Sequence, residues 1–276
     1  MNIRDHLPLV EAPESVWNAI EAALHVGKHR EGRPVWRWRI ALAAAAAVLA
    51  VAAGVYWIGI RRAGWIETNA TTRATLRIGD IGSVEVEPNT RLRVVPQNTL
   101  ANRPDQHRLT LAHGAIHATI SAPPRLFFVD TKSGTAIDLG CEYALNMEED
   151  GSGVLRVTRG WVSFQWEGRE SLVPAGAMCR IRPAKGPDLP YFEDATPGFA
   201  RAVDEGALDS ILGSARVRDT LTLWHLLPRV GPEKRARVYD RIGALTPIPA
   251  AISRERVLAL DTETLNRLKE ELAWKW

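Results

Sequence analysis

Three histidines lie close together in the chain and are the first candidates for chemistry. His107, His113 and His117 fall within eleven residues, and imidazole nitrogens are common zinc ligands. His113 and His117 would share one face of a strand, provided that Gly114 does not interrupt it. A metal site needs further ligands that are not placed beside them, so surface or turn histidines are the favoured interpretation. We predict neither a bound metal nor a cofactor.

The chain contains two cysteines, Cys141 and Cys179, on the same side of the apolar stretch described below. In an oxidising compartment they could form one disulfide that closes a loop of about 38 residues and contributes roughly 3–4 kcal/mol in the chain-entropy model. The sequence does not give their separation, so two buried free thiols remain equally open. Two cysteines alone cannot make a structural zinc site.

Catalytic motifs are the third kind of chemistry to consider. Asp130-Thr131, followed by Ser133-Gly134, is superficially similar to the Asp-Thr-Gly turn of aspartic proteases, but Lys132 and Ser133 interrupt it and there is no second copy. The sequence has no Gly-rich phosphate loop, zinc-protease helix or nucleophile elbow. We therefore predict that the protein is not an enzyme. A formal charge of +3, from 35 basic and 32 acidic residues, argues against a dedicated nucleic-acid binder.

An uncharged stretch of 21 residues, Ile40–Ile60, decides the predicted topology. At about 1.5 Å per helical residue it spans roughly 31 Å, which matches the hydrocarbon core of a bilayer. We predict a transmembrane helix over 40–60. A cleaved signal peptide is the alternative, but bulky residues stand where a cleavage site needs small ones. Aromatic residues flank the stretch as interfacial anchors: Trp36, Trp38, Tyr56, Trp57 and Trp65.

Basic residues on both sides of the stretch indicate its orientation. Positive charge clusters close to the membrane before the stretch, so we predict residues 1–39 in the cytoplasm and the chain after residue 60 outside it, at the bacterial inner membrane. Ala46, Ala50 and Gly54 repeat at four-residue spacing and could bring two such helices together as a homodimer. The flanking residues are Lys28, Arg30, Arg33, Arg37 and Arg39 before the stretch, and Arg61, Arg62, Arg73 and Arg77 after it.

The short segment 1–39 cannot bury a core of its own. Pro13 can start a helix in which four apolar residues share one face, namely Val16, Trp17, Ile20 and Leu24. Such a helix binds a partner protein in a groove or lies along the membrane surface. A loose tail that only carries positive charge is the alternative.

Residues 61–182 are predicted to form a β domain outside the cytoplasm. Short alternating apolar and polar runs recur between turns such as Pro88-Asn89 and Gly151-Ser-Gly153, and Gly168 marks the tip of a hairpin. The pattern predicts a β-sandwich or β-roll of about ten strands. The predicted strands are 75–78, 84–86, 92–94, 109–111, 116–120, 126–129, 136–139, 143–147, 154–157, 161–166 and 171–173.

A Pro-rich linker and a helical region follow the β domain. Pro183, Pro187, Pro190 and Pro197 indicate a stiff connector over 183–198, and helical patterns return over 199–276. The end of the chain, Trp274-Lys-Trp276, indicates contact with a partner or lipid surface. Three helices are predicted: one capped by Asp219 with Leu223, Leu226 and Leu227; one beginning at Pro232 with Val238 and Ile242 inward; and one after Asp261 with Leu265, Leu268 and Leu272 on one face.

The β region resembles the FecR-type periplasmic signalling domain of bacterial iron-citrate sensors and their relatives. About 110 residues carry the resemblance, in order and with similar spacing. The motifs are Pro88-Asn89-Thr90-Arg91-Leu92, Leu109-x-Leu111-x-x-Gly114-x-Ile116, Val129-Asp-Thr131-x-x-Gly134-Thr135-Ala-Ile137-x-Leu139, Leu155-x-Val157-x-x-Gly160-x-Val162 and Leu172-Val-Pro-Ala175-Gly176.

The resemblance implies a membrane-anchored sensor or anti-sigma regulator. In this class an outside β domain receives a signal from an envelope partner, and the cytoplasmic part controls a sigma factor. The chain departs from the pattern because many such regulators carry a larger cytoplasmic domain, so a sigma-factor contact would run through the helix that contains Trp17. The alternative is a cell-envelope scaffold protein that holds a partner with the same domain and passes no signal inward.

Overall fold

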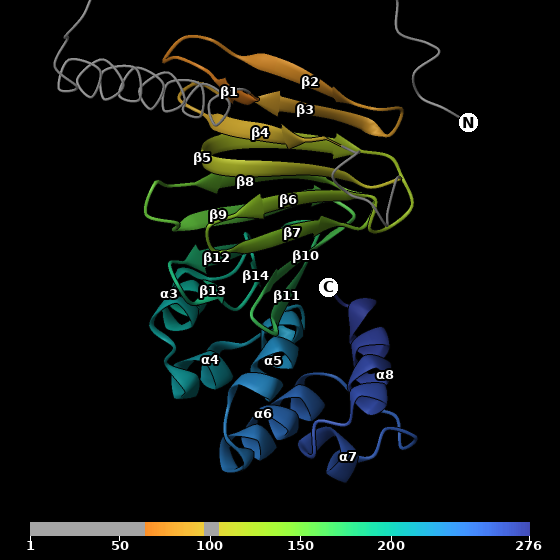
Figure 1. The fold of residues 1–276 in the computed structure, drawn as a ribbon. Coiled ribbons are helices and arrows are strands. Elements are labelled where there is room, and N and C mark those ends of the chain that lie inside the picture. The colour runs from red at the N-terminus through yellow and green to blue at the C-terminus, as the bar shows by residue number, and fades with distance from the viewer. Residues whose placement is uncertain (1–63, 97–104) are drawn as a thin grey trace, which may run out of the picture. The chain divides into compact units, whose positions relative to one another are not determined.

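The computed structural model describes residues 64–96 and 105–276 (Figure 1). Fourteen strands form one sheet, and short helices follow it in the chain. The strands are β1 (Trp65–Glu67), β2 (Ala74–Ile78), β3 (Gly82–Val86), β4 (Arg91–Val95), β5 (His107–Ile120), β6 (Phe127–Thr131), β7 (Gly134–Asp138), β8 (Glu142–Met147), β9 (Gly153–Arg159), β10 (Trp161–Trp166), β11 (Arg169–Pro174), β12 (Ala177–Arg182), β13 (Gly186–Pro187) and β14 (Tyr191–Phe192).

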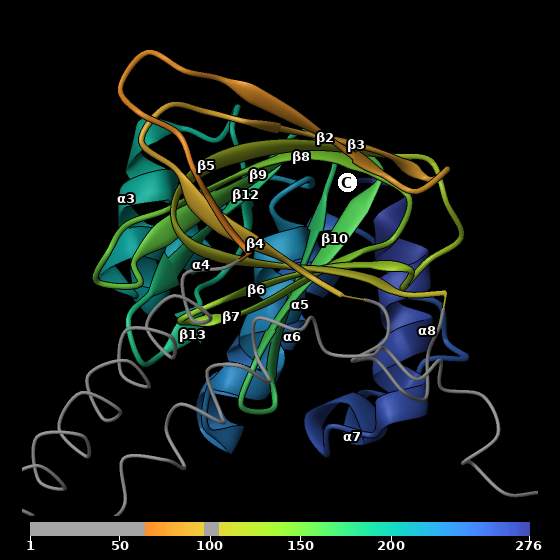
Figure 2. The same cartoon turned by 45° about the horizontal axis from the view of Figure 1, so that its top comes forward.

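The long strand β5 belongs to two halves of the sheet. Its first half pairs with β4 and β6, and its second half pairs with β3 and β8. One half-sheet therefore runs β11-β10-β7-β6-β5-β4-β1, and the other runs β2-β3-β5-β8-β9-β12, with β13 and β14 on the outer side of β12. Figure 2 shows β2, β3 and β8 in one layer and β4, β6 and β7 in the other. All strand pairs are antiparallel except β5 with β6.

The core of the β domain lies between these two layers. Alternate residues of each strand face inward, as the period of a half-buried strand requires. Leu92, Leu111 and Val129 come from one half, and Val84 and Leu145 from the other, and all five side chains are buried in one cluster. Burying an aliphatic side chain of this size contributes about 1.5–3 kcal/mol, so this alternation accounts for much of the stability of the sheet.

Gly114 makes the bend of β5. Its φ of +96° lies in the left-handed region, and a Cβ there would lie 2.4 Å from the Cα of Thr90. The pairing of β4 with β5 also slips by one residue beside this point, between Arg91 and Leu92. A glycine at this position therefore lets β5 leave one half-sheet and enter the other.

The three helices predicted for the C-terminal region are present as α5, α6 and α8, and four further helical segments accompany them. Asp261 caps its helix through the backbone N–H of Thr264, whereas the Asp219 carboxylate accepts from Arg216 instead of from its own helix. The segments are α3 (Pro197–Glu205), α4 (Leu208–Ser214), α5 (Thr220–Leu226), the 3-10 helix η3 (Leu227–Arg229), α6 (Pro232–Leu245), α7 (Arg254–Leu258) and α8 (Thr262–Ala273).

The predicted Pro-rich linker is part of the sheet. Pro187 lies in β13, and Tyr191 and Phe192 form β14, both of which pair with β12. Phe192 is buried in the core of the β domain, while Tyr191 packs among the helices. Residues 64–276 consequently form one compact unit.

The structure confirms a mainly β chain with a small helical C-terminal region. The predicted strands are present, with 109–111 and 116–120 joined in β5, and the hairpin at Gly168 joins β10 to β11. The predicted transmembrane helix at 40–60 and the predicted helix with Val16, Trp17, Ile20 and Leu24 lie outside the described residues. In the described part, no helix combines the length and apolar character needed to cross a membrane.

Candidate functional site

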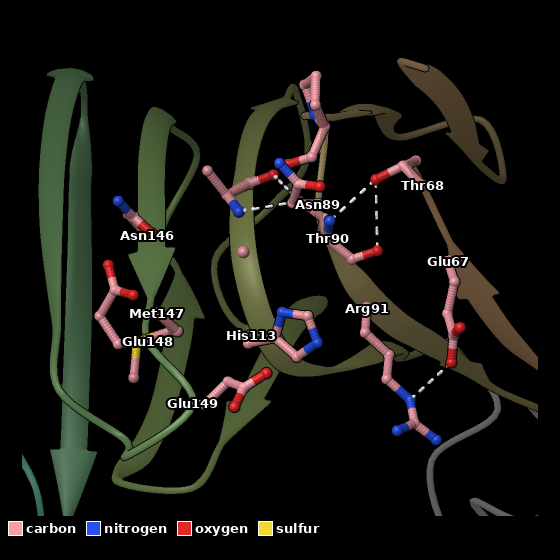
Figure 3. Close-up of a pocket in the computed structure, with 13 residues that line it drawn as sticks. Glu67, Thr68, Asn89, Thr90, Arg91, His113, Asn146, Met147, Glu148 and Glu149 are labelled. Atoms are coloured by element: carbon pink, nitrogen blue, oxygen red, sulfur yellow. Dashed lines mark hydrogen bonds and ion pairs between the residues drawn. The ribbon is translucent and has the colours of Figure 1, made fainter. Parts of the chain in front are cut away.

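A cleft of about 740 Å³ lies where β5 bends (Figure 3). Four segments that are far apart in the sequence form its walls: the end of β1, the loop before β4, the bend of β5 and the turn after β8. The cleft is lined by Glu67, Thr68, Pro88, Asn89, Thr90, Arg91, His113, Gly114, Ala115, Asn146, Met147, Glu148 and Glu149.

Two threonines hold the upper wall of the cleft together. The buried Thr90 hydroxyl accepts a hydrogen bond from the Ala115 N–H at 3.0 Å and donates to the Ala115 carbonyl at 3.1 Å. The Thr68 hydroxyl accepts from the Thr90 N–H at 2.9 Å and donates to the Glu87 carbonyl. Figure 3 shows Thr68 and Thr90 facing one another across this network. The network fixes β1 and the loop before β4 against the bend of β5.

Charged side chains of both signs surround the cleft. Arg91 and Glu67 form an ion pair at 3.0 Å across neighbouring strands. Glu148 and Glu149 stand on the exposed turn after β8, and Lys132 donates to the Glu149 carbonyl. Exposed ion pairs contribute little to stability, about 0–1 kcal/mol. They do equip the cleft to bind polar or charged groups of another molecule.

The bend of β5 separates the histidines that the sequence placed together. His113 faces Arg91 in one half-sheet and lines the cleft, whereas His117 faces Glu85 in the other half-sheet. The His117 side chain is exposed, and its Nε2 lies 3.7 Å from a carboxylate oxygen of Glu87. The condition on Gly114 is therefore not met, and the two histidines do not share a face. No metal-ligating group of three His, Cys, Asp or Glu side chains occurs over 64–96 and 105–276.

The two cysteines are buried and free, so the disulfide between Cys141 and Cys179 is not formed. Cys141 directly precedes β8 and donates to the Asp138 carboxylate, whereas Cys179 lies in β12, with β9 in between. Neighbouring strands are about 4.8 Å apart, so two strand spacings exceed the reach of a disulfide. Burial raises the pKa of the Cys141 thiol well above its usual range, and that of Cys179 to about 12.

The segment that resembles a protease turn is a tight hairpin between β6 and β7. The Asp130 carboxylate accepts from Arg108 at 2.6 Å and from the Thr135 hydroxyl at 2.8 Å. The Thr131 hydroxyl donates to the Gly134 carbonyl, and a Cβ on Gly134 would lie 2.4 Å from the ring of Phe164. These contacts assign the motif a structural role in holding the hairpin.

The sequence predicted no cleft here, although the motif Pro88-Asn89-Thr90-Arg91, quoted for its resemblance to the FecR-type domain, lines part of it. Asn89 has a φ of +55° and forms the turn that presents Thr90 to β5. Thr68, Glu148 and Glu149 were missed because they come from other elements, and no local spacing links them to the motif. Trp65, an expected interfacial anchor, begins β1, and the guanidinium groups of two arginines lie near its ring, Arg91 at 4.8 Å and Arg93 at 5.1 Å.

Comparison with known proteins identifies the β domain. Residues 65–163 match the family model of the FecR protein. No curated protein matches the chain. Two crystal structures of a candidate anti-sigma factor from Parabacteroides distasonis ATCC 8503, at 2.50 and 1.65 Å resolution, share 17% identity with it at a TM-score of 0.40. The match covers 47% of this chain and 60% of that one, so the chain spans less than two thirds of the length of these solved structures. Residues 65–163, from β1 into β10, are therefore FecR-like.

Proposed function

We propose that this protein is a membrane-anchored FecR-like signalling protein that relays an envelope signal to a cytoplasmic sigma factor through protein–protein contacts. One observation carries the proposal: a FecR domain over 65–163 follows an uncharged stretch of 21 residues at 40–60. A stretch of this length suits a single membrane span. The proposal places residues 1–39 in the cytoplasm and the FecR domain on the outer side of the bacterial inner membrane.

The cleft at the bend of β5 suits recognition of a protein in this role. It is open, lined by polar and charged side chains, and built by rigid strands and one hydrogen-bonded loop. Binding surfaces commonly place polar groups on loops that a rigid scaffold holds. The cleft therefore offers the envelope partner a preformed surface.

Binding of a sigma factor by the full chain tests the inward half of the proposal. We expect the purified membrane-bound protein to retain a sigma factor from its own organism. Ile20→Asp should weaken this binding at least about tenfold, because a carboxylate would enter the apolar face of the predicted helix. Asn18→Asp, on the opposite face, is the matched control and should bind normally. If no sigma factor binds the unaltered chain, the protein is better described as an envelope scaffold.

Topology is tested separately. A periplasm-dependent reporter fused behind Trp276 should be active, and alkaline carbonate should not extract the protein from membranes. A reporter that works only in the cytosol, or a protein that carbonate extracts, contradicts the membrane-anchored arrangement.

A further inference from the structure

The sheet has four outer edges, and the helical region and the last strands close two of them. At β11, the Leu172 N–H donates to Nε2 of His225 at 2.9 Å, and the Glu170 carbonyl accepts from Arg229 at 2.9 Å. At β12, the short strands β13 and β14 pair along the outer side. These contacts use backbone N–H and C=O groups that could otherwise form hydrogen bonds with a strand of another molecule.

The other two edges, β1 and β2, have no such cover within the described residues. β1 has three residues and pairs with β4 alone, while β2 has five residues and pairs with β3 alone. In an antiparallel edge strand, every second residue directs its N–H and C=O away from the neighbouring strand. β2 is the longer of the two edges and therefore the better template for an added strand.

The side chains of β2 specify what such a strand would contain. Thr75 and Arg77 are exposed on one face, and no ion pair of Arg77 occurs among the described residues. Ala74 and Leu76 alternate with them and pack, half-buried, at the rim of the core. A strand beside β2 would thus place apolar side chains next to Leu76 and carboxylates next to Arg77.

We propose that β2 is a docking edge for an extended segment of a partner protein in which apolar and acidic residues alternate. The segment adds one strand to the sheet, so that main-chain hydrogen bonds supply affinity and the alternating side chains supply specificity. This proposal rests on the proposed function, because it assumes that the FecR-like domain binds an envelope partner. It names the chemistry of that partner at an edge distinct from the cleft at the bend of β5.

A synthetic peptide tests this edge directly. The probe is a short peptide in which valine and glutamate alternate, added to the full chain in detergent. We expect binding with a dissociation constant below about 1 mM, together with slower hydrogen exchange of the amides in 74–78. Replacing glutamate by lysine, or methylating the backbone nitrogens of the peptide, should abolish binding.

Charge reversal on the protein provides the matched comparison. Arg77→Glu should weaken binding about tenfold, since opposite charges beside one another on neighbouring strands become like charges. Arg156→Glu makes the same change at an exposed position of β9, whose two edges are occupied by β8 and β12, and should leave binding unchanged.

Three results would overturn the inference: no binding at about 1 mM peptide, binding that survives backbone methylation, or an equal effect of the two arginine variants. A dimer of the protein that Arg77→Glu abolishes would assign the edge to a second copy and overturn it as well. Binding of the sigma factor by the cytoplasmic segment is measured independently. A negative peptide result therefore does not contradict the proposed sigma-factor relay, and a negative sigma-factor result does not contradict the docking edge at β2.

Discussion

At the scale of single residues, the cleft depends on a complementary pair, Gly114 and Thr90. The glycine has no side chain where Thr90 passes. The Thr90 hydroxyl accepts from the Ala115 N–H and donates to the Ala115 carbonyl, which also accepts from the Glu87 N–H at 3.0 Å. A buried N–H or C=O without a partner costs about 1–3 kcal/mol, so the threonine stabilises the bend that the glycine permits.

Gly114→Ala should therefore destabilise the protein by about 3–4 kcal/mol. The left-handed backbone costs an alanine roughly 1–2 kcal/mol, and the collision with Thr90 adds roughly another 2 kcal/mol. Gly168→Ala is the matched control, because Gly168 has a φ of +77° but nothing within 4 Å of its Cβ position. It should lose only about 1–2 kcal/mol. Urea unfolding followed by circular dichroism measures both, and equal losses would show that crowding at Thr90 has no effect.

At the scale of elements, helix α5 secures the helical region to the edge of β11 through one histidine. Nδ1 of His225 lies 2.9 Å from the Leu221 carbonyl, which can only accept, so Nδ1 carries the proton. Nε2 is then free to accept from the Leu172 N–H. Burial is the largest cause that lowers the pKa of His225 to about 3; the hydrogen bond to Leu221 acts in the opposite direction, and the nearby Arg229 and Lys269 act in the same direction as burial.

This arrangement predicts a pH dependence of stability with a definite sign. Between about pH 3 and pH 6.5 the unfolded chain binds a proton at His225 and the folded chain does not, so stability falls as the solution is acidified. The contribution is a loss of roughly 2 kcal/mol from pH 7 to pH 5.

His225→Gln should remove that part of the pH dependence, because a glutamine amide does not titrate. His117→Gln, at an exposed position, is the control and should keep the steeper profile. Denaturant titrations of both variants and the unaltered chain across this range provide the measurement. Parallel profiles for the His225 variant and the unaltered chain would contradict the assignment.

At the scale of the whole described unit, the last residue joins the helices to the sheet. The Trp276 ring lies 5.9 Å from that of Trp161 in β10 and 6.3 Å from that of Trp224 in α5, and its indole N–H donates to Thr220. Trp274, two residues earlier, is 89% exposed. The expected external contact through both tryptophans is thus wrong for Trp276, whose side chain is used inside the protein.

Trp276→Ala should cost about 3 kcal/mol of folding stability, since it removes a large side chain from between the helices and the sheet. Trp274→Ala is the natural control and should change stability by less than about 0.5 kcal/mol. Thermal unfolding monitored by circular dichroism distinguishes the two. Similar midpoints for both variants would mean that the C-terminal contact does not hold the helices to the sheet.

Local patterns in the sequence determined most of the elements. Alternation such as Tyr143–Met147 and the turn at Gly168 specify strands and a hairpin, because both depend on neighbouring residues alone. Four strands were missed, namely β1, β12, β13 and β14. β1, β13 and β14 have only two or three residues each and carry no period to detect, whereas β12 has six residues, of which the first three are all buried and so do not alternate. The turn at Pro88-Asn89, which lines part of the cleft, was predicted for the same reason, but the cleft itself was not.

Only the tertiary structure decided which of these residues meet. Cys141 and Cys179 are separated by β9, His113 and His117 by the bend at Gly114, and Thr68 reaches Thr90 through the pairing of β1 with β4. Strand order and register arise from packing between residues far apart in the chain, which no single-segment period encodes. The sequence thus determined most of the strands and the motifs of this FecR-like domain. The pairing of strands around β5 decided the position of the cleft and of the edge at β2, which has no second partner strand among the described residues.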